Sequence, residues 1–173
     1  MLDPKKREGF SRGDAEFLRI VDEYGWHVMS VAPRVDSEDK QEWFSYSTGL
    51  YMRFQHPEIL LCGLDSDTAT RIINEIGNAV KAGRRLALDT DYTDIFANDI
   101  KCCFRVLHPS QYNEYVCFSQ WFYESDEFPV WQCFRPDKKG NYPWERACHQ
   151  SVVELQPLLY QSLGVERVGR RPN

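Results

Sequence analysis

The chain has 173 residues, of which 42% are hydrophobic and 14% aromatic, so it is long enough for one domain with an aromatic-rich core. Its 21 lysines and arginines against 26 aspartates and glutamates give a net charge of −5. Without the basic ends, 1–13 and 164–173, there remain 14 basic and 23 acidic residues, a net charge of −9. This acidic body argues against nucleic acid as the main ligand, because phosphates need a basic surface. It favours either a basic protein partner or plain solubility.

No segment has the composition of a secretion signal or a membrane span. The N-terminal sequence MLDPKKREGFSRGD is charged and no apolar run follows it, and no window reaches about 18 consecutive apolar residues. We therefore expect a cytoplasmic protein, or one exported without such a signal. The six cysteines lie in apolar runs, so we expect free thiols that pack as small hydrophobic groups.

The first third of the chain predicts one helix followed by three strands. Residues 14–24 place apolar side chains at helical spacing, and Gly25 provides a stop. Three segments rich in aromatic, β-branched or aliphatic residues predict strands: 25–33, 43–50 and 56–64. The polar run between the first two of them, 34–42, predicts a solvated loop.

The clearest element is a helix from Ser66 to Ala82. Its apolar residues form a single stripe, which consists of Ala69, Ile72, Ile73, Ile76, Ala79 and Val80. Asp65 and its neighbours offer an N-cap, and Gly83 offers a left-handed C-cap.

The rest of the chain predicts two further strands and two helices. We expect strands over 101–109 and 128–136, a helix over 110–123, and a short helix that begins at Pro157. The strand–helix–strand order around 58–107 resembles a parallel βαβ unit. Together these elements predict a single α+β domain over 1–173. Its sheet would be mixed and mostly antiparallel, with about five strands, helices on one side, and basic flexible ends at about 1–12 and 165–173.

Neither metal nor cofactor binding has support in the residue spacing, so we expect no cofactor, no metal and no catalytic residue. The four histidines lie far apart, and no C-x-x-C or glycine-rich phosphate loop occurs. Cys102 and Cys103 are adjacent on a predicted strand, so their side chains point to opposite faces. His56 and Glu58 could form an acid/base pair. The alternative is a turn leading into a strand, in which the histidine hydrogen-bonds a carbonyl group.

Two segments are candidates for contact with a partner. In DTDYTDIFAND (89–99), Asp89, Asp91 and Asp94 surround Tyr92, which suits a protein-binding face where acids attract and an aromatic ring anchors. The alternatives are a calcium loop, which would need a central glycine and a final glutamate that are missing, and a solvated loop with its rings in the core. The second candidate is the pair Tyr142 and Trp144.

Those two aromatic residues follow the turn sequence PDKKG, residues 136–140. Proline presets its own φ, aspartate can accept hydrogen bonds from the backbone ahead of it, and glycine tolerates positive φ. A turn explains nearly every residue here. It leaves the choice of Tyr142 and Trp144 unexplained, and we therefore interpret these two rings as a contact face.

Several segments in fixed order resemble a known family. They are GWHVMSV, FSYSTGL, HPEILLCGL, the glycine after the long helix, PDKKGNYPWE and QPLL. This set is similar to the bacterial domain of unknown function 4262 over roughly residues 12–160. Phe134 and Arg135 stand where the family is expected to carry an aromatic residue, often tryptophan. The resemblance implies no established chemistry and no catalytic residue. Some small acidic bacterial proteins of unknown function are antitoxins, an analogy only.

The acidic body, the many aromatic residues and the lack of a catalytic constellation favour a binding protein. Our leading hypothesis is an immunity protein that neutralises a toxin, a basic protein domain, by covering its active cleft. The first alternative is a small-molecule-binding domain or enzyme with a pocket near Trp26, Tyr46, His56 and Trp131. The second alternative is a structural subunit of a larger assembly.

Overall fold

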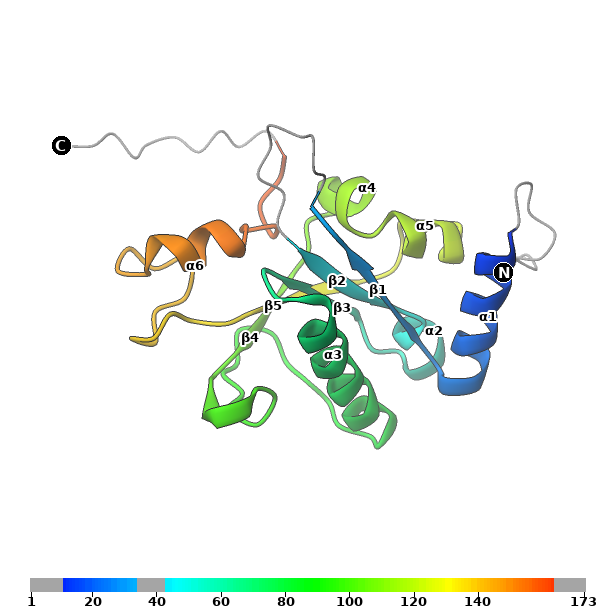
Figure 1. Ribbon diagram of the computed structural model, residues 1–173, viewed down its shortest axis with the longest axis horizontal. Helices are drawn as coiled ribbons and strands as arrows, with labels where there is room; N and C mark the ends of the chain where they lie inside the picture. Colours follow the sequence, from blue (N-terminus) through cyan, green and yellow to red (C-terminus); the bar gives the residue numbers. More distant parts are fainter. Residues whose placement is uncertain (1–10, 34–42, 164–173) are drawn as a thin grey trace.

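A five-stranded mixed sheet organises the protein (Figure 1), whose computed structural model describes residues 11–33 and 43–163. The strands are β1 (His27–Val31), β2 (Phe44–Thr48), β3 (Glu58–Cys62), β4 (Cys103–Val106) and β5 (Val130–Phe134), in the order β1-β2-β3-β5-β4. β1, β2 and β3 form an antiparallel meander, β5 runs parallel to β3, and β4 pairs antiparallel with β5 at the edge. The predicted α+β class and the mostly antiparallel sheet are confirmed.

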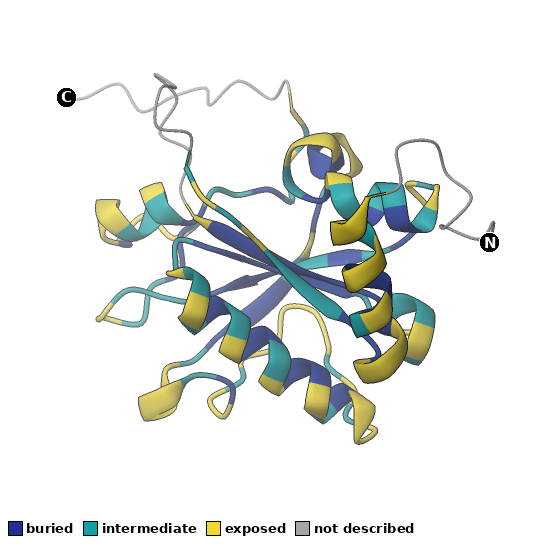
Figure 2. Ribbon diagram, turned by 45° about the vertical axis from the view of Figure 1, so that its right-hand side comes forward, coloured by how far each residue is buried: buried dark blue, intermediate teal, exposed yellow. Residues whose placement is uncertain are grey.

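Helices cover both faces of the sheet, so the prediction of helices on one side was wrong. The described helices are α1 (Arg12–Tyr24), α2 (Leu50–Phe54), α3 (Ser66–Lys81), α4 (Tyr112–Tyr115), α5 (Cys117–Tyr123) and α6 (Gln150–Leu155). Two 3-10 turns span Ala97–Asp99 and Pro109–Gln111. All of β3 is buried, because Ile59 and Leu61 face α3 whereas Leu60 and Cys62 face α4 and its neighbours. Figure 2 shows the central strands β2 and β3 buried between helices whose outer sides are exposed, whereas the edge strand β1 is only partly buried.

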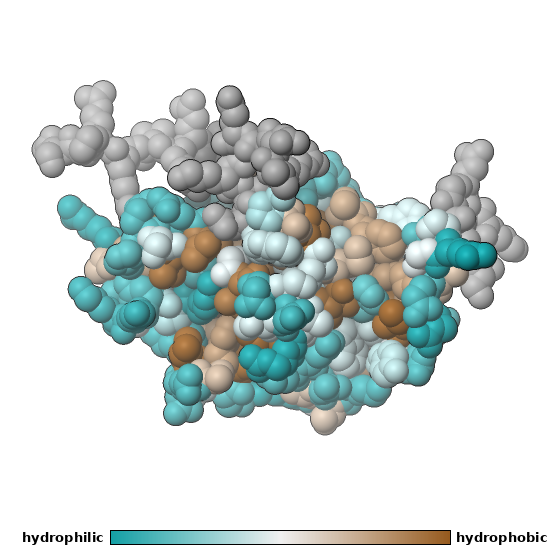
Figure 3. Space-filling view, viewed as in Figure 1, coloured by the Kyte–Doolittle hydropathy of each residue, from teal (hydrophilic) through white to brown (hydrophobic). Residues whose placement is uncertain are grey.

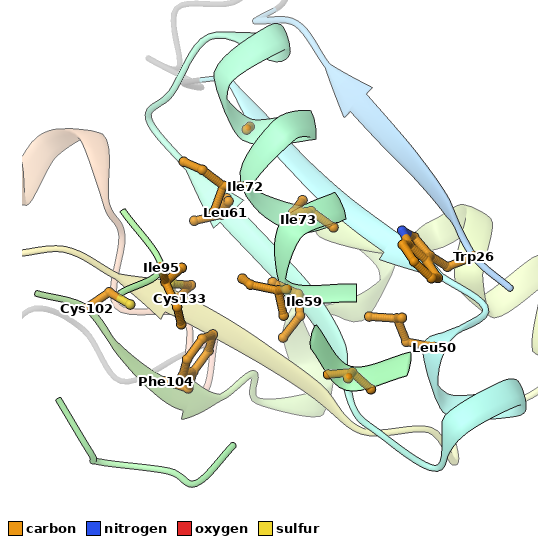
Figure 4. Packing of buried hydrophobic residues seen from close by; sticks show 13 residues of the cluster. Trp26, Leu50, Ile59, Leu61, Ile72, Ile73, Ile95, Cys102, Phe104 and Cys133 are labelled. Atoms are coloured by element: carbon orange, nitrogen blue, oxygen red, sulfur yellow. The ribbon is translucent and has the colours of Figure 1, made fainter. Parts of the chain in front are cut away.

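The main core lies between α3 and the sheet, as the apolar stripe predicted. Ile72 and Ile73 of α3 pack over Ile59 and Leu61 of β3 (Figure 4). The side chain of Asp65 caps the helix by accepting a hydrogen bond of 2.9 Å from the Thr68 amide. Gly83 follows the helix with φ +97°, the conformation predicted for it. Among the described residues, no helix is long and apolar enough to cross a membrane.

Other predicted elements need correction. The segment 58–107 is not a parallel βαβ unit, because β4 pairs antiparallel with β5, and β5 is the parallel neighbour of β3. The expected helix over 110–123 breaks at Val116, with φ −137° and ψ 32°, into α4 and α5. The short α2 was not predicted at all.

The last helix lies before Pro157 rather than after it. α6 ends at Leu155, and Gln156 lies outside the helical region, with φ −130° and ψ 79°, because a following proline disfavours the helical conformation. Residues 157–163 form turns instead of the helix expected there. The predicted polar loop 34–42 and nearly all of the predicted basic, flexible ends lie outside the described residues.

Candidate protein-binding surface

Two basic side chains lie on one face of β4 and the residues just before it. Lys101, Cys103 and Arg105 alternate along the chain, so their side chains point the same way. Cys103 packs with Phe134 and Tyr142 in a small aromatic cluster. Cys102 points to the opposite face and joins the main core, as predicted. The two cations therefore flank an apolar contact between β4 and the chain that follows β5.

Arg105 is held between aromatic rings and an acid. Its guanidinium carbon lies 3.6 Å from the centre of the Trp144 ring and 4.6 Å from that of Tyr160. Its Nε donates a hydrogen bond of 3.0 Å to Asp89 Oδ1. Guanidinium groups stack well on aromatic faces because they are planar and weakly hydrated. The side chain of Asp89 is 67% exposed, so its carboxylate faces water next to a fixed arginine.

A second cation and acid lie beside the first. Asp91 accepts a hydrogen bond of 2.7 Å from the Tyr142 hydroxyl, and its other oxygen is 3.3 Å from Lys101 Nζ. Lys101 Nζ is 4.7 Å from the centre of the Tyr142 ring, which stacks on Trp144 at 4.7 Å. Burial raises the pKa of Tyr142, and the hydrogen bond to Asp91 adds to this effect, so the hydroxyl stays protonated and donates.

We call this group the β4 surface, and it consists of Asp89, Asp91, Lys101, Arg105, Tyr142, Trp144 and Tyr160. It joins four of the six residues proposed from the sequence, although the two segments are about 50 positions apart. Sequence reasoning missed Lys101, Arg105 and Tyr160. The alternation of Lys101 and Arg105 with Cys103 was a usable signal for the two cations.

The other two proposed residues, Tyr92 and Asp94, lie apart from this group. Arg84 donates two hydrogen bonds to Asp94, of 2.8 and 2.9 Å, and these lower the pKa of the carboxyl group. The Tyr92 ring is half-buried against Phe104 of the main core, and its hydroxyl accepts a hydrogen bond from the Ala87 amide. Tyr92 therefore anchors its own loop, as in the interpretation that placed the rings of this loop in the core.

The PDKKG segment forms the predicted turn. Asp137 Oδ1 accepts hydrogen bonds of 2.9 Å from the amides of Lys139 and Asn141, and Oδ2 accepts one of 3.0 Å from the amide of His149. Gly140 has φ +87°, the value that only glycine adopts easily. These amide donors, Asn141 first, lower the pKa of Asp137 to about 2.

His56 and Glu58 do not bond to each other. His56 Nδ1 donates a hydrogen bond of 2.7 Å to the Pro57 carbonyl, which is the turn foreseen as the alternative to an acid/base pair. Glu58 is fully buried and accepts hydrogen bonds from Ser47 and Tyr123 and from the amides of Gly49 and Tyr51. Burial raises the pKa of Glu58, although its hydrogen-bond donors act in the opposite direction.

The four residues of the alternative pocket are spread over the fold. Trp26 packs on the α3 side, where its Nε1 donates to Asn74 Oδ1 at 2.9 Å, whereas Tyr46 packs on the opposite face of the sheet. His56 and Trp131 are in contact, with ring centres 5.4 Å apart. The structure thus brings together only the last two of these four residues.

The surface seen in Figure 3 carries small hydrophobic patches separated by hydrophilic side chains. In the part of the chain that the structure describes, no group of three or more His, Cys, Asp or Glu side chains is placed to hold a metal ion. The six cysteines are free, and five of them are buried.

Comparison with known families gives a match over most of the chain. The family model described as a domain of unknown function (DUF4262) matches residues 20–149, which is most of the chain. This range contains every strand of the sheet and most of the β4 surface, and it ends just before α6. No curated protein and no solved structure matches the chain.

Proposed function

The chain belongs to the DUF4262 family, and from this premise we propose that it is a binding protein whose β4 surface contacts another protein. One observation carries the proposal. Two segments about 50 positions apart meet so that Arg105, stacked on Trp144 and Tyr160, lies next to the exposed carboxylate of Asp89. Tryptophan, tyrosine and arginine contribute most of the binding energy at many protein interfaces, because they combine large area with polar groups.

The partner that fits is a protein with a basic surface. Residues 14–163 carry a net charge of −9, and such a field speeds association with a cationic partner. The acids at this site are already oriented by Arg105 and Lys101, so little side-chain entropy is lost when a partner binds. We assign the role of an immunity protein, which acts in the cytoplasm and neutralises a toxin by covering its active cleft.

The test compares two charge-reversed variants of the tagged protein. Asp89→Lys with Asp91→Lys, the loop variant, changes the two acids of the β4 surface, each of which pairs with a lysine or arginine. Glu23→Lys with Glu75→Lys makes the same change in net charge on α1 and α3, at acids that also form single exposed ion pairs. Partners are captured from the native host by affinity purification and identified by mass spectrometry. Affinity for the purified partner is then measured at several salt concentrations.

We expect a stoichiometric basic partner that binds the unchanged protein and the control, and binds the loop variant about tenfold or more weakly. The salt dependence of the loop variant should also be flatter. Equal binding by both variants would exclude this surface, and the absence of any partner would contradict the proposed role. Thermal unfolding of each variant shows whether it is folded.

A further inference from the structure

A second concave site lies where the PDKKG turn meets the start of α6. The chain leaves β5, turns, and returns as α6 at one end of the molecule (Figure 1). The groove between these segments has a volume of about 390 Å³, and the residues that line it include Lys138, Lys139, Ala147, His149, Ser151 and Val152. Small-molecule sites have volumes of about 300–1,000 Å³, so the groove has the size of a small ligand.

The wall of the groove is fixed by Asp137. Both oxygens of this carboxylate accept backbone amide hydrogen bonds, from Lys139, Asn141 and His149, which tie the turn to the start of α6. Asp137, the one acid that lines the groove, thus uses both carboxylate oxygens in backbone hydrogen bonds. The two lysines that follow it are exposed, and they carry the positive charge of the lining.

The hydrogen bonds of the His149 ring show which of its two nitrogens carries the hydrogen in the neutral form. The Ser151 amide donates to His149 Nδ1 at 3.3 Å, and the Ser151 hydroxyl lies 2.8 Å from the same atom. A nitrogen that accepts from a backbone amide carries no hydrogen, so the hydrogen of the neutral ring is on Nε2. His149 therefore offers the groove an N–H donor, and Ala147 and Val152 offer it apolar surface.

We propose that this groove binds a small phosphate monoester, with the phosphate at Lys138, Lys139 and His149 and the organic part on Ala147 and Val152. Two ammonium groups and a ring N–H form charge-assisted hydrogen bonds with phosphate oxygens. Residues 14–163 together carry a net charge of −9, so an anionic ligand is favoured where basic side chains gather, as Lys138 and Lys139 do in this groove. The groove is lined by none of the residues of the β4 surface, and this proposal does not depend on the proposed function.

The test uses phenyl phosphate as the probe, with phenol and inorganic phosphate as comparisons. Binding to the full chain is followed by amide chemical shifts and by calorimetry. The test variant is Lys138→Gln with Lys139→Gln, which removes both ammonium groups and leaves Asp137 in place. The control is Arg19→Gln with Arg71→Gln, which removes two exposed cations on α1 and α3.

We expect saturable shifts at residues 137–152 with phenyl phosphate, weaker binding of inorganic phosphate to the same amides, and no saturable binding of phenol. The lysine variant should bind about tenfold or more weakly, and the arginine control should bind as the unchanged protein does. Absence of saturable shifts, shifts elsewhere, or equal weakening in both variants would each overturn the proposal. Equal binding of phenol would do the same, because the groove would then recognise only the ring.

Discussion

Glu58 connects three elements through one carboxyl group. It lies at the start of β3, yet its Oε1 accepts the amides of Gly49 and Tyr51 around the start of α2 and the hydroxyl of Tyr123 at the end of α5. Its Oε2 accepts the Ser47 hydroxyl of β2. A buried acid is tolerated only when hydrogen bonds satisfy it, and removing it leaves its donors buried and unpaired.

Replacing Glu58 with alanine should therefore destabilise the fold strongly. We expect Glu58→Ala to lower the free energy of unfolding by about 3–5 kcal/mol. The measurement is equilibrium denaturation by urea. Glu75→Ala on the exposed side of α3 is the matched control and should change stability by no more than about 0.5 kcal/mol. Similar losses for the two variants would show that the hydrogen bonds of Glu58 contribute little.

Asp137 should make stability depend on pH in the acid range. Because its pKa falls from 3.8 to about 2 on folding, the ionised form is favoured in the folded state. The stability that the ionised Asp137 contributes is thus fully present above the pKa of this residue in the unfolded chain. It is lost as pH falls from about 4 towards 2. The difference in melting temperature between the unchanged protein and Asp137→Ala should shrink over this range. Lys138→Ala, in the same turn, should show no such trend, and a constant difference for Asp137→Ala would refute the prediction.

At the scale of elements, Gly77 lets α3 lie close against Trp26. A Cβ atom at this position would be 2.5 Å from two carbons of the indole ring, which is itself held by Asn74. Glycine inside a helix usually costs about 1 kcal/mol relative to alanine. Here glycine is favoured over alanine, because an alanine methyl group would push the indole ring of Trp26 out of the position in which it hydrogen-bonds Asn74.

Gly77→Ala should accordingly lower stability, by about 1–3 kcal/mol, in a helix where alanine normally stabilises. Asn78→Ala, at the next and exposed position of α3, should leave stability unchanged or raise it slightly. Both can be measured by thermal unfolding under one set of conditions. An increase in melting temperature for Gly77→Ala would mean that the ring moves at no cost.

Elements with strong local signals were predictable, and those decided by distant contacts were not. The α3 stripe, the Gly25 and Gly83 caps and the PDKKG turn depend on residues within one or two turns of chain. The parallel pairing of β3 with β5 depends on segments that are far apart, so the local pattern suggested the wrong parallel partner. At the β4 surface, composition identified the acids and the rings. The pairing of Asp89 with Arg105 needed the three-dimensional structure.

At the scale of the whole molecule, the fold extends past the family match. The match ends at residue 149, yet residues beyond it form hydrogen bonds with β5 and with the residue that follows it. Gln156 exchanges two hydrogen bonds of 2.9 Å with the backbone of Arg135, and the carbonyl of Leu159 accepts one from the His108 amide. Buried Gln132 of β5 donates to the Pro157 carbonyl and accepts from the Leu159 amide. Residues 156–159 thus belong to the core.

Two leucines of this final segment test that conclusion. Leu159 is 4% exposed and Leu163 is 57% exposed. Leu159→Ala should lower the free energy of unfolding by about 2–5 kcal/mol, because it leaves a cavity in the cluster around Tyr112 and Val130. Leu163→Ala should stay within about 0.5 kcal/mol. Equal, small effects in urea denaturation would mean that the domain is complete without this segment.

The order of the strands in the sheet also constrains how the chain can assemble. β1, β2 and β3 are neighbours in sequence and can pair as soon as they exist, with α3 closing over them. β4 is made before β5, yet among the described strands it hydrogen-bonds only to β5, the strand that also pairs in parallel with β3. Such distant pairing slows folding, because the entropy cost of closing a long loop comes before the stabilising contacts form. A nascent chain that ends before β5 therefore exposes the edges of both β3 and β4, and the protein depends on its last third to protect strands that were synthesised earlier.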